Sequence, residues 1–331
     1  MASPTLPTTR RVFRRTDNHS PGTPKVQAIP DEPIPPLAPT SLLIKVHTIS
    51  LNTPTSPTVI AVGDAVKEYK IGDRVAPITD TENLTGREKK RSWLAADEDG
   101  VLAEYVVFDE WKVVRLPGYL SWEEACLLPC AGVTAWSSLV GVGVGRSVLI
   151  QGTGGVALFA LKLARAAGLK VILSSSSDAK LSKIAAQFSC PAILTVNYKT
   201  NPDWHEEVLK LTGGEGVDLV VDVGGSATLV QSVKCTRRGG IVSQVGYLSK
   251  GKGEEDAGIE GLLGVLIDRR VVLRGINAGS KQDMNDLCAA LDATQMSLEN
   301  IIDSIEPFEK AEEAIQYIWE GRQVGKVVLR V

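Results

Sequence analysis

The residues with the clearest chemical meaning form a short glycine turn near the middle of the chain. Gly152, Gly154 and Ala157 match the pattern G-x-G-x-x-G/A, directly after the apolar run 148–150 and at the start of an amphipathic segment. The first glycine permits a tight turn, the second lets a pyrophosphate approach the backbone, and the small third residue allows close helix–strand packing. Free N–H groups and the positive end of the helix dipole would hold the phosphates. The predicted cofactor contacts in the turn are Gly152, Thr153, Gly154, Gly155 and Val156, and the alternative is a glycine-rich turn that only packs.

A run of serines stands where an NAD enzyme usually has an acidic residue. That acidic residue, about twenty positions along the chain, binds the ribose 2′-hydroxyl; here the position falls on residues 174–177, which are all serine. Serine hydroxyls can donate hydrogen bonds to a 2′-phosphate, and Lys180 is near enough to add a positive charge. Asp178 comes slightly late for the ribose contact and could be a helix-start residue. We therefore predict NADPH as the cofactor, with Ser174, Ser175, Ser176 and Lys180 as its contacts; the alternative is that the serines form a loop and a helix cap.

Residues for metal or nucleophilic catalysis are scarce in this chain. A catalytic zinc ion takes three protein ligands, whereas the three histidines, His19, His47 and His205, have no cysteine or second histidine at ligand spacing. Cys126 and Cys130 lie four apart in the apolar segment 125–139, where buried small side chains are the expected interpretation. No G-x-S-x-G motif is present. We therefore predict no metal site, and the chemistry has to come from a bound cofactor that the protein orients.

Two kinds of architecture must position these residues. Up to about residue 117, short β-branched runs between turn residues predict a barrel of short strands, with the prolines at 30–39 as a stiff extended connector. From residue 147 to residue 275, short apolar strands alternate with helices, which predicts a doubly wound parallel sheet. One apolar helix is expected over 125–139, and two more near 281–291 and 308–320. The last strand, 326–331, is expected to return to the barrel.

Composition and charge exclude several classes of function. With 331 residues, 44% of them hydrophobic, the chain is long enough for two globular domains. A net charge of −3 offers no basic surface for nucleic acid, and no apolar run reaches the roughly eighteen residues of a membrane span. The N-terminus lacks the apolar core of a secretory signal, and the five cysteines are odd in number and scattered. We therefore expect a cytoplasmic protein with reduced thiols and a small-molecule substrate.

Several motifs, in this order, resemble the medium-chain dehydrogenase/reductase superfamily. They are Gly72-Asp73-Arg74-Val75, residues 100–105, Ala131-Gly132-Val133-Thr134-Ala135-Trp136, the turn at 152–157 and the ending at 325–329. The resemblance extends over nearly the whole chain, and the absence of zinc ligands together with Leu51-Asn52 is similar to the zinc-independent, quinone-oxidoreductase-like branch. It implies an α/β fold with a GroES-like β-barrel catalytic domain and a Rossmann domain. Residues 1–118 and 281–331 would form the catalytic domain, and residues 119–280 the dinucleotide-binding domain.

The resemblance also implies roles for residues outside the glycine turn. Thr134 would contact the nicotinamide, or be a helix hydroxyl bonded back to the backbone, and Asn52 would face the nicotinamide or the substrate, or cap a strand end. Tyr198 would pack at the adenosine phosphate, or fill the core. Tyr247 or water would donate a proton, and Lys326 would reach the cofactor or substrate, or lie at the surface. Further implied cofactor contacts are Gly224, Gly246, Tyr247, Leu248 and Asn277. The family also implies a homodimer through the edge of the Rossmann sheet.

One stretch departs from the family pattern. Only residues 53–58 separate Asn52 from Val59, where the family has a segment longer by on the order of twenty residues, enough for several helical turns. That segment normally forms part of the substrate cleft wall, so its loss would widen the site or disable it. Two hypotheses follow. The first is a zinc-independent oxidoreductase that transfers a hydride between NADPH and a small carbonyl compound, quinone, activated alkene or alcohol; the second is a catalytically degenerate relative that binds dinucleotide as a sensor or partner-binding module.

Overall fold

The computed structural model describes residues 5–16, 25–51, 55–246 and 261–331, and the chain splits into two compact units. One unit combines residues 1–133 with 279–331, and the other is the continuous segment 134–278. We predicted domain boundaries after residues 118 and 280. In the structure, the segment after residue 118 contacts the strands of the first unit, because the Trp122 carbonyl accepts hydrogen bonds from Thr48 Oγ1 at 2.7 Å and Ser56 Oγ at 2.6 Å.

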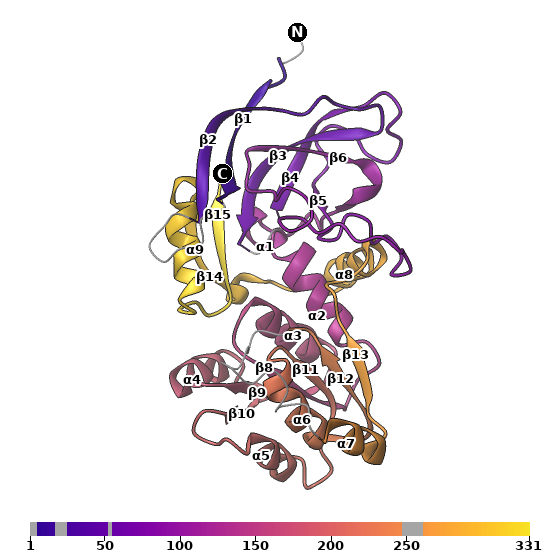
Figure 1. Cartoon of the computed structure of the whole chain (residues 1–331), viewed down its shortest axis with the longest axis vertical. Coiled ribbons are helices and arrows are strands. Elements are labelled where there is room, and N and C mark those ends of the chain that lie inside the picture. The colour runs from indigo at the N-terminus through magenta and orange to yellow at the C-terminus, as the bar shows by residue number, and fades with distance from the viewer. Residues whose placement is uncertain (1–4, 17–24, 52–54, 247–260) are drawn as a thin grey trace. The chain divides into compact units, whose positions relative to one another are not determined.

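The first unit is built from short strands around one apolar core (Figure 1). Its largest sheet contains β14 (Ile302–Pro307), β15 (Lys326–Arg330), β3 (Ser41–Ser50), β4 (Thr55–Val62) and β6 (Tyr105–Asp109). Two smaller sheets pair β1 (Thr9–Arg15) with β2 (Val26–Pro33), and β5 (Val75–Pro77) with β7 (Val113–Arg115). Val12, Leu42, Ile44 and Phe308 are fully buried at the centre, so β-branched and aromatic side chains from distant parts of the chain share one core.

The strand predictions for this unit are mostly confirmed. The last strand does return to the barrel, since β15 pairs antiparallel with β3 and places Val328 opposite Ser50. Strand β14, which we did not predict, pairs parallel with β15. The proline connector was wrong in part, because Pro30 and Pro33 lie within β2. A two-stranded sheet consists of edges, where a proline without an N–H group can be accommodated, and Pro30 falls at the register shift between β1 and β2.

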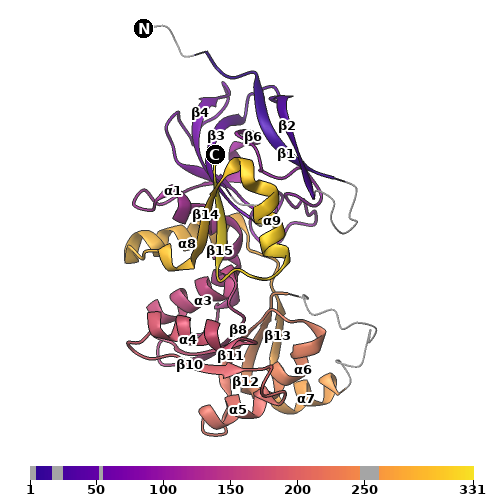
Figure 2. The ribbon, with the colours of Figure 1, turned by 90° about the vertical axis from the view of Figure 1, so that its left-hand side faces the viewer.

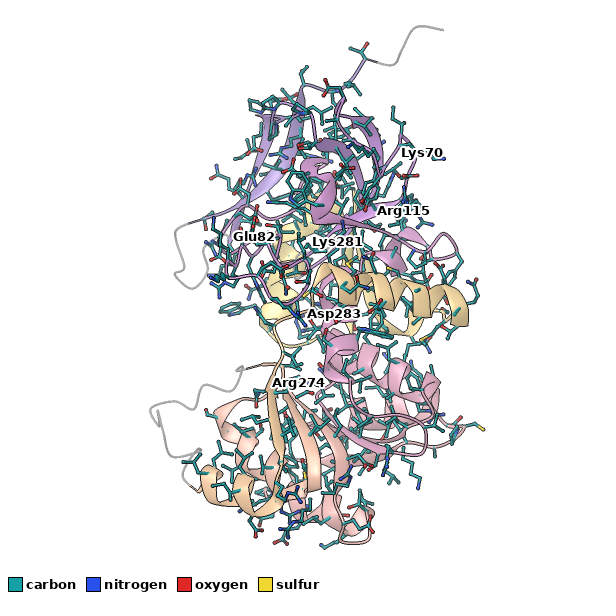
Figure 3. All side chains as sticks on the ribbon, turned by 90° about the vertical axis from the view of Figure 1, so that its right-hand side faces the viewer. Lys70, Glu82, Arg115, Arg274, Lys281 and Asp283 are labelled. Atoms are coloured by element: carbon teal, nitrogen blue, oxygen red, sulfur yellow. The ribbon has the colours of Figure 1, made fainter. Side chains whose placement is uncertain are left out.

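The single helix predicted over 125–139 was also wrong. The segment contains α1 (Trp122–Ala125), a π-helical turn η2 (Leu128–Gly132) and α2 (Val133–Ser138). Pro129 lies at the start of the π turn, and a proline removes a helical N–H donor and disfavours an uninterrupted α-helix. The remaining helices of the first unit are η1 (Glu110–Lys112), α8 (Lys281–Thr294), η3 (Glu299–Ile301), η4 (Phe308–Lys310) and α9 (Ala311–Trp319). Helix α8 begins at the capping box of Ser280 and Asp283, close to the labelled Lys281 in Figure 3.

The second unit contains the predicted parallel sheet. Its strand order is β10 (Leu194–Asn197), β9 (Lys170–Ser175), β8 (Ser147–Gln151), β11 (Val217–Asp222), β12 (Thr236–Gln244) and β13 (Val272–Gly275). Figure 2 shows α3 (Gly155–Ala166) and α4 (Asp178–Gln187) on one side of the sheet. Helices α5 (Trp204–Leu211), α6 (Ser226–Cys235) and α7 (Leu262–Arg269) lie on the other side. The order reverses at β8, which lies between β9 and β11, so the carboxyl ends of these strands form the ligand-binding edge of such a sheet.

Candidate active site

The glycine turn has the conformation that phosphate binding requires. Gly152 follows β8 with a φ of +85°, a left-handed conformation that favours glycine, and its N–H donates to the Ser174 carbonyl at 2.8 Å. Gly154 is the N-cap of α3 and provides no side-chain cap for the first turn of the helix. A Cβ atom at Gly154 would have no neighbour within 4 Å, so the space beside this backbone is open. Helix α3 packs through its other face, where Ala157 is 3% exposed. The turn therefore presents helix N–H groups to an anion.

The four serines at 174–177 differ in their exposure to solvent and in their hydrogen bonds. Ser174 and Ser175 are buried, whereas Ser176 is exposed. Ser177 is the N-cap of α4 and accepts a hydrogen bond from the Lys180 N–H at 3.3 Å, so the cap alternative holds for this one serine. Asp178 accepts a hydrogen bond from Asn197 Nδ2 at 2.8 Å. Ser176 is thus the member of the run whose side chain is accessible at the end of β9.

Tyr198 lies beside the same strand end. Its N–H donates to the Ser175 carbonyl at 3.1 Å, and its side chain is 44% exposed. The core-filling alternative for Tyr198 is therefore wrong. Asn277, on the other side of the sheet, is also exposed and follows β13. Asn52, Tyr247 and Leu248 lie outside the described residues.

A buried carboxylate that the sequence did not single out organises the next strand end. Asp222, fully buried at the end of β11, accepts hydrogen bonds from the N–H groups of Gly224 at 2.9 Å and Gly225 at 3.1 Å. It also accepts from Thr228 Oγ1 at 2.8 Å and Ser232 Oγ at 2.6 Å. Each of these donors lies within ten residues of Asp222 in the chain, but Gln151 Nε2, at the end of β8, approaches from a distant segment at 3.4 Å. Asp222 thus fixes the turn between β11 and α6 against the glycine turn after β8.

Gly224 and Gly246 are explained by packing within this same region. A Cβ atom at Gly224 would collide with the Thr228 side chain, and one at Gly246 would collide with the Val223 carbonyl. The cofactor contacts expected at Gly224 and Gly246 stay predictions. Both glycines allow the close backbone approaches that shape the ends of β11 and β12.

Thr134 is positioned by helix α2. It is 6% exposed, and its carbonyl accepts a hydrogen bond from Ser138 Oγ at 2.6 Å, so the Ser138 hydroxyl bonds back along this helix. The nicotinamide contact of Thr134 stays a prediction. The Ser138 carbonyl in turn accepts from Ser243 Oγ at 2.8 Å and from Arg274 Nη2 at 3.1 Å. Figure 3 labels Arg274, which comes from β13. These contacts tie the helix that carries Thr134 to β12 and β13.

Lys326 is placed at the start of β15 in the first unit. Its side chain is 4% exposed, so the surface alternative for this lysine is wrong. Burial lowers the pKa of Lys326, and the nearby Cys130 and Cys126 oppose that shift. Burial also raises the pKa of Cys126 to about 12. The pair of cysteines is mostly as predicted, since Cys126 is fully buried and Cys130 is half-buried.

Neither a metal-binding cluster nor a membrane-spanning helix occurs in the described ranges. There, no three side chains from His, Cys, Asp or Glu come together in a way that could hold a metal ion. Within the same ranges, no helix has both the length and the apolar composition for crossing a membrane.

The fold and the turn first define a class of protein. A parallel sheet with a glycine turn after its switch-point strand, opening on a helix N-terminus, is the dinucleotide-binding fold of oxidoreductases. Residues 45–118 match the alcohol dehydrogenase GroES-like domain, and residues 155–293 match the zinc-binding dehydrogenase family. The chain belongs to the medium-chain dehydrogenase/reductase superfamily, as the sequence motifs predicted.

Individual relatives agree with this assignment. The chain is 37% identical over 279 residues to a zinc-type alcohol dehydrogenase-like protein of Schizosaccharomyces pombe, which covers 82% of this chain and 78% of that protein. It is 28% identical to an NADP-dependent isopropanol dehydrogenase of Entamoeba histolytica, covering 78% of this chain and 74% of that enzyme. The crystal structure of an NAD-dependent alcohol dehydrogenase superposes with a TM-score of 0.82 at 28% identity, covering 97% of this chain and 99% of that one.

Proposed function

We propose that the protein is an NADPH-dependent, zinc-independent oxidoreductase that acts on a small carbonyl compound, quinone, activated alkene or alcohol. The observation that carries this proposal is the open turn at Gly154, where the N-terminus of a twelve-residue helix faces free space. Bound NADPH would supply a hydride to a carbonyl compound, quinone or activated alkene, and bound NADP⁺ would accept one from an alcohol. The chain's own part is to bind and orient: Gly152 shapes the turn, the N–H groups of residues 153–156 hold the pyrophosphate, and Thr134 contacts the nicotinamide.

The cofactor preference rests on this chain's own residues, because the relatives named above use either NAD or NADP. Ser176 is exposed at the end of β9, and Lys180 lies in the first turn of α4. A hydroxyl and an ammonium group favour a 2′-phosphate, whereas a carboxylate would repel it. The one acidic side chain nearby in the sequence, Asp178, already accepts a hydrogen bond from Asn197. These features support NADPH over NADH.

Zinc independence is proposed from the available donor groups. A catalytic zinc ion needs three protein ligands, and no such group occurs among the residues that the structure describes. Cys126 is fully buried, and neither Cys126 nor Cys130 belongs to a group of three possible ligands among the described residues. The possible ligand side chains therefore do not fit a zinc ion, although the matching family is described as zinc-binding dehydrogenase. No step of the proposed reaction is assigned to a metal.

A homodimer through the edge of the Rossmann sheet is part of the proposal. Strand β13 is the last strand of the sheet, and Val272 and Leu273 on it are 55% and 39% exposed. Leu263 and Ile267 of α7 add exposed apolar surface, at 73% and 74%. An exposed apolar edge strand can pair with the same strand of a second copy. Light scattering tests this: we expect a dimer for the wild type and a monomer for Val272→Lys, and a wild-type monomer would overturn the homodimer.

The state of the cysteines supports the cytoplasm as the compartment. All five cysteines are free, as expected in a reducing environment.

The binding test uses a variant that changes the turn without disturbing the fold. Gly154→Val places a side chain in open space, and the φ of −81° at this position suits any residue. We expect this variant to unfold like the wild type and to bind NADPH at least about tenfold more weakly, a loss of about 1.4 kcal/mol. Gly143→Val, in the same unit and also in open space, is the matched control. Unchanged NADPH binding by Gly154→Val would place the cofactor elsewhere.

A turnover assay separates the enzyme from the rival function. We expect steady NADPH consumption with at least one member of a panel of aldehydes, enones and quinones. Tight NADPH binding without turnover of any panel member would favour the catalytically degenerate dinucleotide-binding protein. The short connection between Asn52 and Val59 is the feature that makes this second function worth testing.

A further inference from the structure

A large apolar pocket lies wholly within the first unit. Its volume is about 730 Å³, and it is lined by side chains from β1, β2, the end of β3, the loop 93–102 and α9. The apolar lining residues include Phe13, Leu51, Leu94, Ile315, Ile318 and Trp319. A pocket of this size falls in the range of small-molecule sites, about 300–1,000 Å³.

The pocket lies next to the stretch in which the chain departs from its family. Ile49, Ser50 and Leu51 line it, and Leu51 directly precedes Asn52, the residue that the family resemblance places at the substrate. The short connection that follows lacks the segment that usually forms part of the substrate cleft wall.

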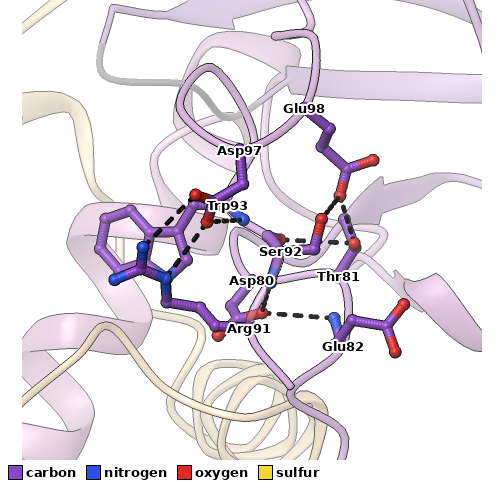
Figure 4. A network of polar contacts seen from close by, with 8 residues as sticks. All are labelled: Asp80, Thr81, Glu82, Arg91, Ser92, Trp93, Asp97 and Glu98. Carbon is purple, nitrogen blue, oxygen red and sulfur yellow. Dashed lines mark hydrogen bonds and ion pairs between the residues drawn. The ribbon is translucent and has the colours of Figure 1, made fainter.

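One wall of the pocket is a loop that hydrogen bonds hold in place. Figure 4 shows the network around it. Asp80 Oδ1 accepts from the Ser92 N–H at 2.9 Å, and Glu98 accepts from Ser92 Oγ at 2.7 Å and also from Thr81 Oγ1. Asp97 Oδ2 accepts from the Trp93 N–H at 3.0 Å. These bonds fix both ends of the segment 92–98 that carries Leu94 to the pocket, so the cavity is pre-formed, as small-molecule sites usually are.

We infer that this pocket binds the apolar chain of the carbonyl substrate, so that a small aldehyde with a hydrocarbon tail, such as octanal, is preferred over a short one. The inference rests on the proposed function and narrows its substrate class. Two of the charged lining residues are paired with each other, since Arg14 contacts Asp99 at 3.1 Å, and Arg14 also contacts Glu32 at 2.6 Å. The apolar side chains of the lining therefore offer contact area for a hydrocarbon chain.

Direct binding tests the pocket without the cofactor. Calorimetric titration with n-octanol is expected to show saturable binding to the wild type. Trp319 is 77% exposed and lines the pocket from α9, so Trp319→Ala removes pocket surface with little risk to the fold. We expect about tenfold weaker octanol binding by this variant, or about 1.4 kcal/mol. Trp111→Ala is the control, since Trp111 is 41% exposed in the same unit and does not line the pocket. Ala96→Phe, which adds a ring at an exposed lining position, is expected to weaken binding as well.

A turnover series tests the link to the substrate. With NADPH and propanal, hexanal or octanal, KM is expected to fall about three- to fourfold per added methylene, the factor for about 0.8 kcal/mol of burial. Trp319→Ala is expected to raise KM for octanal and leave KM for propanal unchanged. Absence of octanol binding, or binding that neither Trp319→Ala nor Ala96→Phe changes, would overturn the pocket. Turnover that is independent of chain length would overturn its role in substrate binding. Octanol binding without any turnover would count against the proposed function and not against the pocket.

Discussion

The buried carboxylate of Asp222 offers the most quantitative test of how this unit is held together. It accepts hydrogen bonds from two backbone N–H groups and two hydroxyls within 3.1 Å, and it has no exposed surface. Hydrogen bonds to charged groups contribute about 1.5–3 kcal/mol each, and a buried donor that loses its acceptor costs a similar amount. If two donors remain without an acceptor in Asp222→Ala, the free energy of unfolding should fall by about 3–6 kcal/mol. That is a large share of the roughly 5–15 kcal/mol that stabilises an ordinary protein.

The asparagine variant separates geometry from charge. Asp222→Asn keeps the size of the side chain and one acceptor oxygen, but its amide NH₂ group would replace an oxygen that now accepts from Ser232 Oγ or from the Gly224 N–H. We therefore expect a smaller loss of about 1–3 kcal/mol. Urea unfolding followed by circular dichroism measures both variants. Asp203 is exposed and makes no side-chain cap, so Asp203→Asn is the control and should change stability by less than about 0.5 kcal/mol. An Asp222→Ala variant within about 1 kcal/mol of the wild type would refute the central role of this carboxylate.

Three further predictions concern the pH dependence of stability and the choice of cofactor. Burial lowers the pKa of His47, and the charges of Lys45 and Arg74 add to the effect, so the unfolded state takes up a proton more readily than the folded state. Stability should therefore fall as the pH drops below about 6.5. We expect His47→Gln to reduce this fall in the urea midpoint, and a variant with the pH profile of the wild type would contradict the prediction. Burial likewise lowers the pKa of Lys326, so the free energy of unfolding should rise with pH between this lowered pKa and about 10.4, the pKa of an unperturbed lysine. We expect Lys326→Met to lack this rise between neutral pH and about pH 9. A variant that keeps the rise would show that Lys326 does not cause it. Ser176→Glu should weaken NADPH binding by at least about tenfold and spare NADH, because a carboxylate repels the 2′-phosphate; equal loss of both cofactors would point to a structural effect instead.

Local sequence patterns determined much of the second unit. The pattern of β8, the glycine turn and α3 lies in one continuous stretch, so the positive φ of Gly152 and the helix N-terminus at Gly154 could be predicted from residue types and spacing. The alternation of apolar strands with amphipathic helices likewise predicted the parallel sheet, since each crossover unit is local in the chain. The family motifs in the barrel served the same purpose in the first unit, where strand periodicity alone is weak.

Tertiary structure decided the features that depend on distant segments. Asp222 looks like an ordinary strand-end acid in the sequence, and its role appears only when folding brings it to Gln151, seventy-one positions earlier in the chain. The burial of Lys326 has the same origin, because a strand-end lysine becomes desolvated only when β15 enters the barrel sheet. The apolar pocket is assembled from β1, the end of β3, the loop 93–102 and α9, which no local pattern connects. Turn and helix preferences depend on residues that are neighbours in the chain, so the glycine turn and its helix could be predicted from the sequence. Side-chain burial and hydrogen-bond partners depend on how distant segments pack together, so the environments of Asp222, Lys326 and the pocket required the folded structure.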